Sequence, residues 1–134
     1  MSDRPPSTLP PETGDTVRLS LPAATRYLAA ARVVATSLGA ESGLTVDELD
    51  DLRLGVNELV SLLVEVAAPG SRVDLEFEVD DVRITVRGAI DGAVAETMEL
   101  DELTRRIVEA VVDHHEVDGS SFSLSKAASL RGDS

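Results

Sequence analysis

The sequence predicts a two-layer α/β sandwich of the α+β type, in which helices cover one face of a mixed sheet. Apolar residues recur at steps of three and four in three segments, a pattern typical of amphipathic helices. They alternate with polar residues in shorter segments, as in strands with one buried face. Along the chain the order is strand, helix, helix, strand, strand, helix, strand, strand, with no internal repeat.

The first quarter of the chain contributes one strand and one helix. Val17, Leu19 and Leu21 alternate with polar residues, which indicates a short strand. A helical stripe follows, for which Pro22 marks a start and Gly39 a stop. The alanines in AAARVVA indicate that this helix packs closely against a neighbour.

The most informative segment, residues 44–65, is predicted to form one long helix. Thr45 and Glu48 have the spacing of a capping box, and Pro69-Gly70 ends the helix. Its apolar stripe predicts the buried face, and the residues between the apolar positions form the opposite face. That opposite face carries Asp51, Leu54, Glu58, Leu62 and Glu65. Leucines among carboxylates indicate that a loop or a partner covers part of this face.

The second half alternates strands with one further helix. Residues 72–79 and 82–87 predict a hairpin whose outer face is solvated, and residues 88–99 predict a loop. Asp101 can cap a third helix, and a final hairpin turns at Asp118-Gly119.

Length and composition indicate one domain in a reducing compartment. We place the domain at residues 16–127, between a flexible N-terminal tail, 1–15, and a frayed C-terminal tail, 128–134. The chain has no cysteine, no apolar run near the roughly 20 residues that span a bilayer, and no apolar core of a signal peptide. These features predict a cytoplasmic protein.

Charge excludes several function classes. The net charge of −13 repels phosphate backbones and anionic lipids, so we expect neither direct nucleic-acid binding nor membrane binding. His114-His115 would point to opposite faces of a strand, so no metal site is predicted there. The tripeptide Arg131-Gly132-Asp133, in the tail, is interpreted as a chance match to an adhesion motif.

Three features together resemble one known family. They are the strand ending Leu21-Pro22-Ala23, the alanine-rich helix containing Arg32, and LRLGVNELVSLLVE followed by a hairpin. The chain resembles, from about residue 16 to Lys126, the anti-sigma factor/serine-protein kinase group (RsbW-like) of the GHKL (histidine-kinase/HSP90-type) ATPase superfamily. The resemblance implies the two-layer fold of those ATPases.

The resemblance also implies where an ATP site would lie. Glu58 matches the family's glutamate, which can act as a general base. The asparagine that helps hold Mg²⁺ one turn later is replaced by Leu62, and Asn57 points elsewhere around the helix.

Two further family features are missing or displaced. Arg87-Gly88 stands where an adenine-binding aspartate follows the second hairpin strand, and Asp91-Gly92 could serve only through a shifted loop. No glycine lies between Gly92 and Gly119 to form the family's phosphate-binding lid. We therefore expect degenerate ATP-binding motifs and no bound cofactor.

Three functional hypotheses follow. The leading one is a regulatory protein-binding module that sequesters a sigma factor and is released by an antagonist protein, without ATP hydrolysis. The alternative is an ATP-dependent serine-protein kinase that phosphorylates its antagonist, with Glu58 as base and Asp91 or Glu65 helping to bind Mg-ATP. The third is an adaptor that binds neither protein. The resemblance also implies homodimers that pair through the sheet and first-helix side.

Overall fold

The computed structural model describes residues 14–129. The Arg131-Gly132-Asp133 tripeptide and most of the two expected tails lie outside this range. The elements in chain order are β1 (Asp15–Pro22), a 3₁₀ turn η2 (Thr25–Tyr27), α1 (Leu28–Glu41), α2 (Val46–Val66), β2 (Arg72–Val79), β3 (Arg83–Asp91), α3 (Glu102–Val111), β4 (His114–Asp118) and β5 (Ser121–Ala127). Their order is the one predicted.

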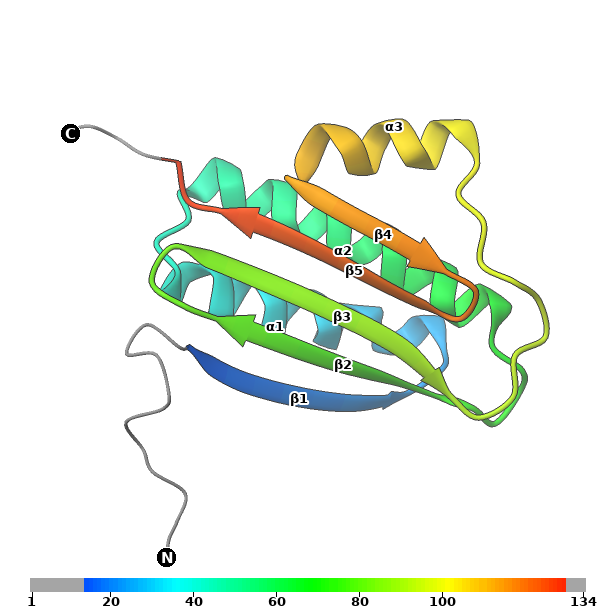
Figure 1. The fold of residues 1–134 in the computed structure, drawn as a ribbon. Coiled ribbons are helices and arrows are strands. Elements are labelled where there is room, and N and C mark those ends of the chain that lie inside the picture. Colours follow the sequence, from blue (N-terminus) through cyan, green and yellow to red (C-terminus); the bar gives the residue numbers. More distant parts are fainter. Residues whose placement is uncertain (1–13, 130–134) are drawn as a thin grey trace, which may run out of the picture.

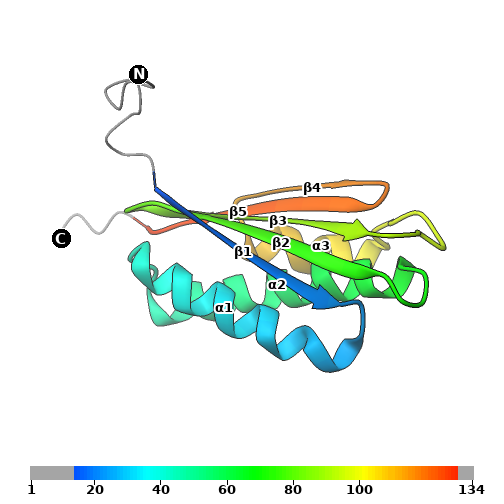
Figure 2. The same cartoon turned by 90° about the horizontal axis from the view of Figure 1, so that it is seen from below.

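The predicted two-layer sandwich is confirmed. Over residues 14–129, five strands form one sheet in the order β1-β2-β3-β5-β4, and α1, α2 and α3 all lie on the same side of it (Figures 1 and 2). Figure 2 shows the sheet edge-on with its other face uncovered. No helix in this part of the chain combines the length and apolarity needed to cross a bilayer.

The expectation of a mixed sheet is wrong, because all four strand pairings are antiparallel. Two helices in succession separate β1 from β2, so the chain reverses three times and β2 returns antiparallel to β1. The single helix α3 makes β4 parallel to β3, but β5 lies between those two strands. No parallel neighbours result.

The centre of the core is the buried face of α2. Seven of its residues are buried, and they are Leu52, Gly55, Val56, Leu59, Val60, Leu63 and Val66. The predicted close packing of the alanine-rich helix is also present, since Ala31 and Ala35 of α1 are completely buried. Burial of α2 is therefore shared between the sheet and the flanking helices.

The first helix differs from its predicted bounds at both ends. Pro22 pairs with Arg72 in the sheet, so α1 begins only at Leu28, after the η2 turn. Gly39 does not stop the helix, which continues to Glu41. A Cβ on Gly39 would lie 2.8 Å from Leu52 Cδ2, so this glycine allows the close approach of α2. Gly43, with a φ of 82°, follows instead.

The predicted loop at residues 88–99 begins later than expected. β3 continues to Asp91 because both neighbouring strands pair with it beyond residue 87. On one side Gly88 faces Leu75, and on the other it faces Phe122. Gly88 and Ala89 weaken the alternation in this stretch, but strand pairing on both sides maintains the extended backbone.

The capping box at the start of α2 is confirmed, and its glutamate also contacts residue 129. Glu48 Oε1 accepts from the Thr45 N–H at 2.8 Å, and Thr45 Oγ1 accepts from the Glu48 N–H at 3.1 Å. Glu48 Oε2 accepts from the Ser129 N–H at 3.0 Å. The Ala128 N–H donates to Val82 O at 2.8 Å, so backbone hydrogen bonds hold residues 128 and 129, the described part of the expected C-terminal tail.

A second packing feature lies at the middle of β3, where Gly88 is buried. A Cβ on Gly88 would lie 2.5 Å from Cε2 of Phe122 and 2.9 Å from Cδ2 of Leu75. The Phe122 ring, itself buried, therefore fills the space that a side chain at position 88 would need.

We predict that the contribution of Glu48 to stability depends on pH. Hydrogen bonds from the Thr45 and Ser129 backbone lower the pKa of Glu48 from 4.5 to about 2, with burial opposing them. The folded state thus binds this proton less readily than the unfolded state, so the stabilisation is complete above about pH 4.5 and is lost as the pH falls toward 2.

Urea unfolding of the native protein and of Glu48→Gln, measured from pH 7 to pH 3, checks this. The gap in unfolding free energy should be about 1 kcal/mol at pH 7 and should narrow below pH 5. Glu109→Gln, which removes an exposed carboxylate of α3, should show no such narrowing. A gap for Glu48→Gln that stays constant over the whole range would contradict the assignment.

We predict that Gly88→Ala destabilises the fold by about 1–3 kcal/mol, because the added methyl overpacks the core against Phe122. The measurement is a double-mutant cycle with Phe122→Leu, which removes the ring. In that background Gly88→Ala should cost clearly less. Equal costs in both backgrounds would mean that the ring does not limit this position.

Candidate functional site

The flank of α2 that faces away from the core carries the candidate general base. Glu58 lies in the middle of this helix and is half-buried. Among residues 14–129 its carboxylate has no hydrogen-bond or ion-pair partner. Leu62, one turn later, is partly buried and packs against the core, so it supplies no ligand atom beside Glu58.

The end of α3 packs directly on α2 next to this flank. A Cβ on Gly55 would lie 2.7 Å from Val112 Cγ1, so the two segments meet without space between them. Nearby, Lys126 Nζ of β5 lies 3.5 Å from Asp51 Oδ2, with the lysine side chain only 12 % exposed. An apolar contact and an ion pair thus occupy this end of the flank.

The segment between β3 and α3, where a phosphate-binding lid was considered, is fixed by backbone hydrogen bonds. Val66 O, at the end of α2, accepts from the Ala95 N–H at 2.7 Å and the Glu96 N–H at 3.2 Å. The Met98 N–H donates to Gly119 O at 2.7 Å, and the Met98 side chain is buried. These N–H groups are therefore committed to protein carbonyls.

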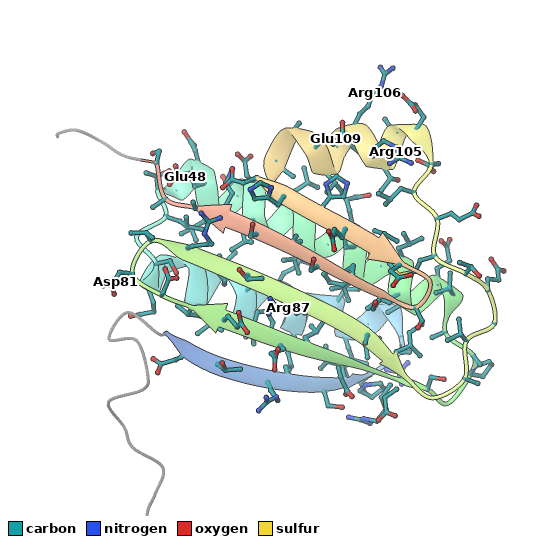
Figure 3. All side chains as sticks on the ribbon, in the orientation of Figure 1. Glu48, Asp81, Arg87, Arg105, Arg106 and Glu109 are labelled. Atoms are coloured by element: carbon teal, nitrogen blue, oxygen red, sulfur yellow. The ribbon has the colours of Figure 1, made fainter. Side chains whose placement is uncertain are left out.

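The helix that follows this segment begins as predicted. The Asp101 carboxylate accepts from the Thr104 N–H at 2.7 Å, and this bond holds the pKa of Asp101 below its usual value. α3 then runs along the sheet with Arg105, Arg106 and Glu109 exposed (Figure 3).

Arg87-Gly88 stands where the resemblance implies an adenine-binding aspartate, and of these two residues Gly88 is the buried one. It lies on the face of the sheet that the helices cover, and the Phe122 ring takes the space in front of it. Sequence reasoning identified the missing aspartate but not the phenylalanine. Phe122 comes from β5, 34 positions further along, and only the strand pairing brings the two together.

The structure places the other candidate, Asp91, away from Glu58. Asp91 ends β3 opposite Arg72 of β2. Because side chains alternate along β3 and those of Ile84 and Val86 are buried under the helices, Asp91 lies on the helix-free face. Glu65 is exposed near the end of α2. Their roles toward Mg-ATP stay predictions.

Three hollows are prominent on the surface, and neither Glu58 nor Asp91 lines any of them. The largest, about 820 Å³, crosses the helix-free face of the sheet. A second, about 450 Å³, lies between Arg105 of α3, residues 98–100 and β4. The third, about 400 Å³, lies between α1 and α2.

The third hollow contains a contact that sequence reasoning missed. Arg32 of α1 donates to Asn57 Oδ1 of α2 at 2.7 Å, and Leu54, 40 % exposed, lies beside them. Leu54 and Leu62 therefore differ, since only Leu62 packs against the core. The sequence does place Asn57 off the Glu58 flank, but no local pattern indicates that Arg32 is its partner.

The histidines do not form a metal centre with other side chains. His114 is exposed and His115 is half-buried on the adjacent position of β4. Among residues 14–129 no three His, Cys, Asp or Glu side chains are grouped so that they could hold a metal ion.

Comparisons with known proteins identify the family. No curated protein sequence matches the chain. The family model described as the histidine kinase-like ATPase domain matches residues 21–121, well over half of the chain. That range runs from the end of β1 to the start of β5 and includes α2 with Glu58, the β2–β3 hairpin and α3. The chain belongs to the histidine kinase-like ATPase domain family, within the GHKL superfamily.

Proposed function

We propose that the protein is a regulatory protein-binding module of the anti-sigma type, which acts by occlusion rather than by phosphotransfer. It sequesters a cytoplasmic sigma factor from RNA polymerase, and an antagonist protein competes for it. The observation that carries the proposal is the Phe122 ring, which fills the space in front of Gly88 where the family's nucleotide would need an aspartate.

Two more contacts support the loss of nucleotide binding. Leu62 packs against the core at the position of the family's Mg²⁺-holding asparagine. The segment before α3 donates its Ala95, Glu96 and Met98 N–H groups to protein carbonyls rather than leaving them free for phosphates. Each change removes a separate part of the site, and all three favour binding over catalysis.

The surface charge supports a protein partner. A net charge of −13 complements the basic segments with which a sigma factor contacts DNA and polymerase, and covering such segments would block both contacts. Regulation then depends on the relative affinities of the sigma factor and its antagonist. Homodimerisation stays a prediction from the resemblance.

One observation favours the alternative, a serine-protein kinase. Glu58 is half-buried on α2 and has no partner within residues 14–129, so its carboxylate is free to accept a proton. A kinase would still need an Mg²⁺ ligand, from Asp91 or Glu65, and a different position for the segment before α3.

We predict that millimolar Mg-ATP does not stabilise the protein against heat. A ligand present at 100 times its Kd adds about 2.7 kcal/mol, which for a domain of this size raises the Tm by about 10 °C. Thermal unfolding with and without 5 mM Mg-ATP distinguishes the two functions, because only a nucleotide-binding kinase would show the rise in Tm.

The controls are Glu58→Gln and Glu109→Gln, which each remove one carboxylate of a helix. No shift in any of the three proteins is expected. A rise of several degrees that Glu58→Gln abolishes and Glu109→Gln retains would overturn the proposal and make the kinase the leading function.

We also predict that one of the organism's own sigma factors, purified separately, binds the protein without ATP and is thereby kept from core RNA polymerase. Gel filtration of each pair, followed by competition with core polymerase, measures this. Glu58→Gln should bind and compete as the native protein does. If no sigma factor binds, the anti-sigma assignment fails, whatever the nucleotide result.

A further inference from the structure

The helix-free face of the sheet is hollowed along its middle. We call this hollow the outer trough, and its volume is about 820 Å³. Short side chains line its floor on three strands, namely Ser20 of β1, Ala89 of β3, and Ser121 and Ser123 of β5. Long side chains would fill this face, so the short ones leave a depression between higher rims.

One rim of the outer trough is electrically neutralised. Arg18 lies 3.0 Å from a Glu76 carboxylate oxygen, and Arg87 lies 2.9 Å from one of Glu78. Arg87 is also 3.9 Å from Glu76. Figure 3 shows Arg87 on the helix-free face, at the middle of β3. Both arginines thus already have carboxylate partners within the sheet.

The remaining charges of the outer trough are carboxylates without such partners. Glu116 and Asp118 of β4 line the opposite rim, and Asp74 of β2 lines the trough as well. None of the three forms an ion pair with another residue of 14–129. The trough is therefore electronegative, and its serine hydroxyls add acceptors and donors along the floor.

We propose that the outer trough is a docking surface for a cationic segment of a partner protein. Lysine or arginine side chains would pair with Glu116, Asp118 and Asp74, while small apolar side chains would contact the floor around Ala89. This deepens the proposed function by locating a partner surface, and it depends on that function only for the identity of the partner.

Charge favours this occupant over the others. Nucleic acid and acidic peptides would bring further negative charge to a chain of net charge −13. The resemblance implies a dimer through the sheet and first-helix side, but charge opposes a second copy in the trough. Its Glu116 and Asp118 would add carboxylates to this face, and its Arg18 and Arg87 are already paired. A basic segment meets neither obstacle.

The test is a titration of the ¹⁵N-labelled full chain with a synthetic helical peptide of repeating lysine and leucine, followed by amide chemical shifts. We expect the largest shift changes at residues 87–89 and 116–123, and few on α2, although α2 also carries exposed carboxylates. Changes concentrated on α2, or no binding up to millimolar peptide, would overturn the proposal.

Two matched pairs of variants sharpen the result. Glu116→Lys combined with Asp118→Lys should weaken peptide binding at least tenfold, whereas Glu109→Lys combined with Glu102→Lys, on α3, should change it less than threefold. Ala89→Tyr, which fills the floor, should weaken binding similarly. Thr85→Tyr, on the same strand and face but outside the trough, should not.

The oligomeric state distinguishes a second copy of this chain from a cationic partner segment as the occupant of the outer trough. Sedimentation of the native chain as a dimer that Ala89→Tyr splits and Thr85→Tyr leaves intact would assign the outer trough to a second copy and overturn the proposal. The peptide titration does not use a sigma factor. A chain that binds the peptide in the trough but no sigma factor would therefore refute the proposed function alone.

Discussion

The whole molecule depends on how α2 is seated against the sheet. Leu52, Val56, Leu59 and Leu63 are completely buried, and each such side chain contributes about 1.5–3 kcal/mol relative to exposure. Glycines on both sides of this contact let the neighbours approach, Gly39 for α1 and Gly55 for the end of α3. Because Glu58, the candidate base, lies on the same helix, this packing also fixes its position.

In this chain the observations on the family fold and those on its nucleotide site point in different directions. Family membership rests on the family-model match over residues 21–121. Leu62 and Gly88, at positions where the resemblance implies nucleotide-binding residues, instead pack against or within the core. Gly88 and Phe122 illustrate the difference, since the ring fills the space in front of the glycine, which the proposed function takes to be space that a nucleotide would need. Removing the buried Phe122 ring would leave a cavity and destabilise the fold. Restoring a metal-binding side chain at an exposed position carries no such cost.

Local sequence predicted most of the elements, because hydrophobic period and caps are local properties. The Thr45 and Glu48 box and the Asp101 cap are examples, and both hairpins were placed correctly. The insertion of β5 between β3 and β4 could not be predicted, because a period says which face is buried but not which strands pair. For the same reason Gly39 was interpreted as a stop, since its role depends on Leu52 from another helix. Ser121 and Ser123 alternate with Phe122 on β5, but no local pattern indicates the trough that these serines form with β1 and β3.

The strand order has a consequence for biosynthesis. β5, the last strand within residues 14–129, lies inside the sheet, and β3 keeps an open edge until residues 121–127 leave the ribosome. Until then Leu75 and Val86 lack the cover of Phe122 and Leu124, and the nascent chain presents an unpaired strand edge with apolar side chains. Completion of the fold is therefore a late event, and a chain that stalls or is truncated before residue 121 would expose an aggregation-prone strand rather than a smaller stable domain.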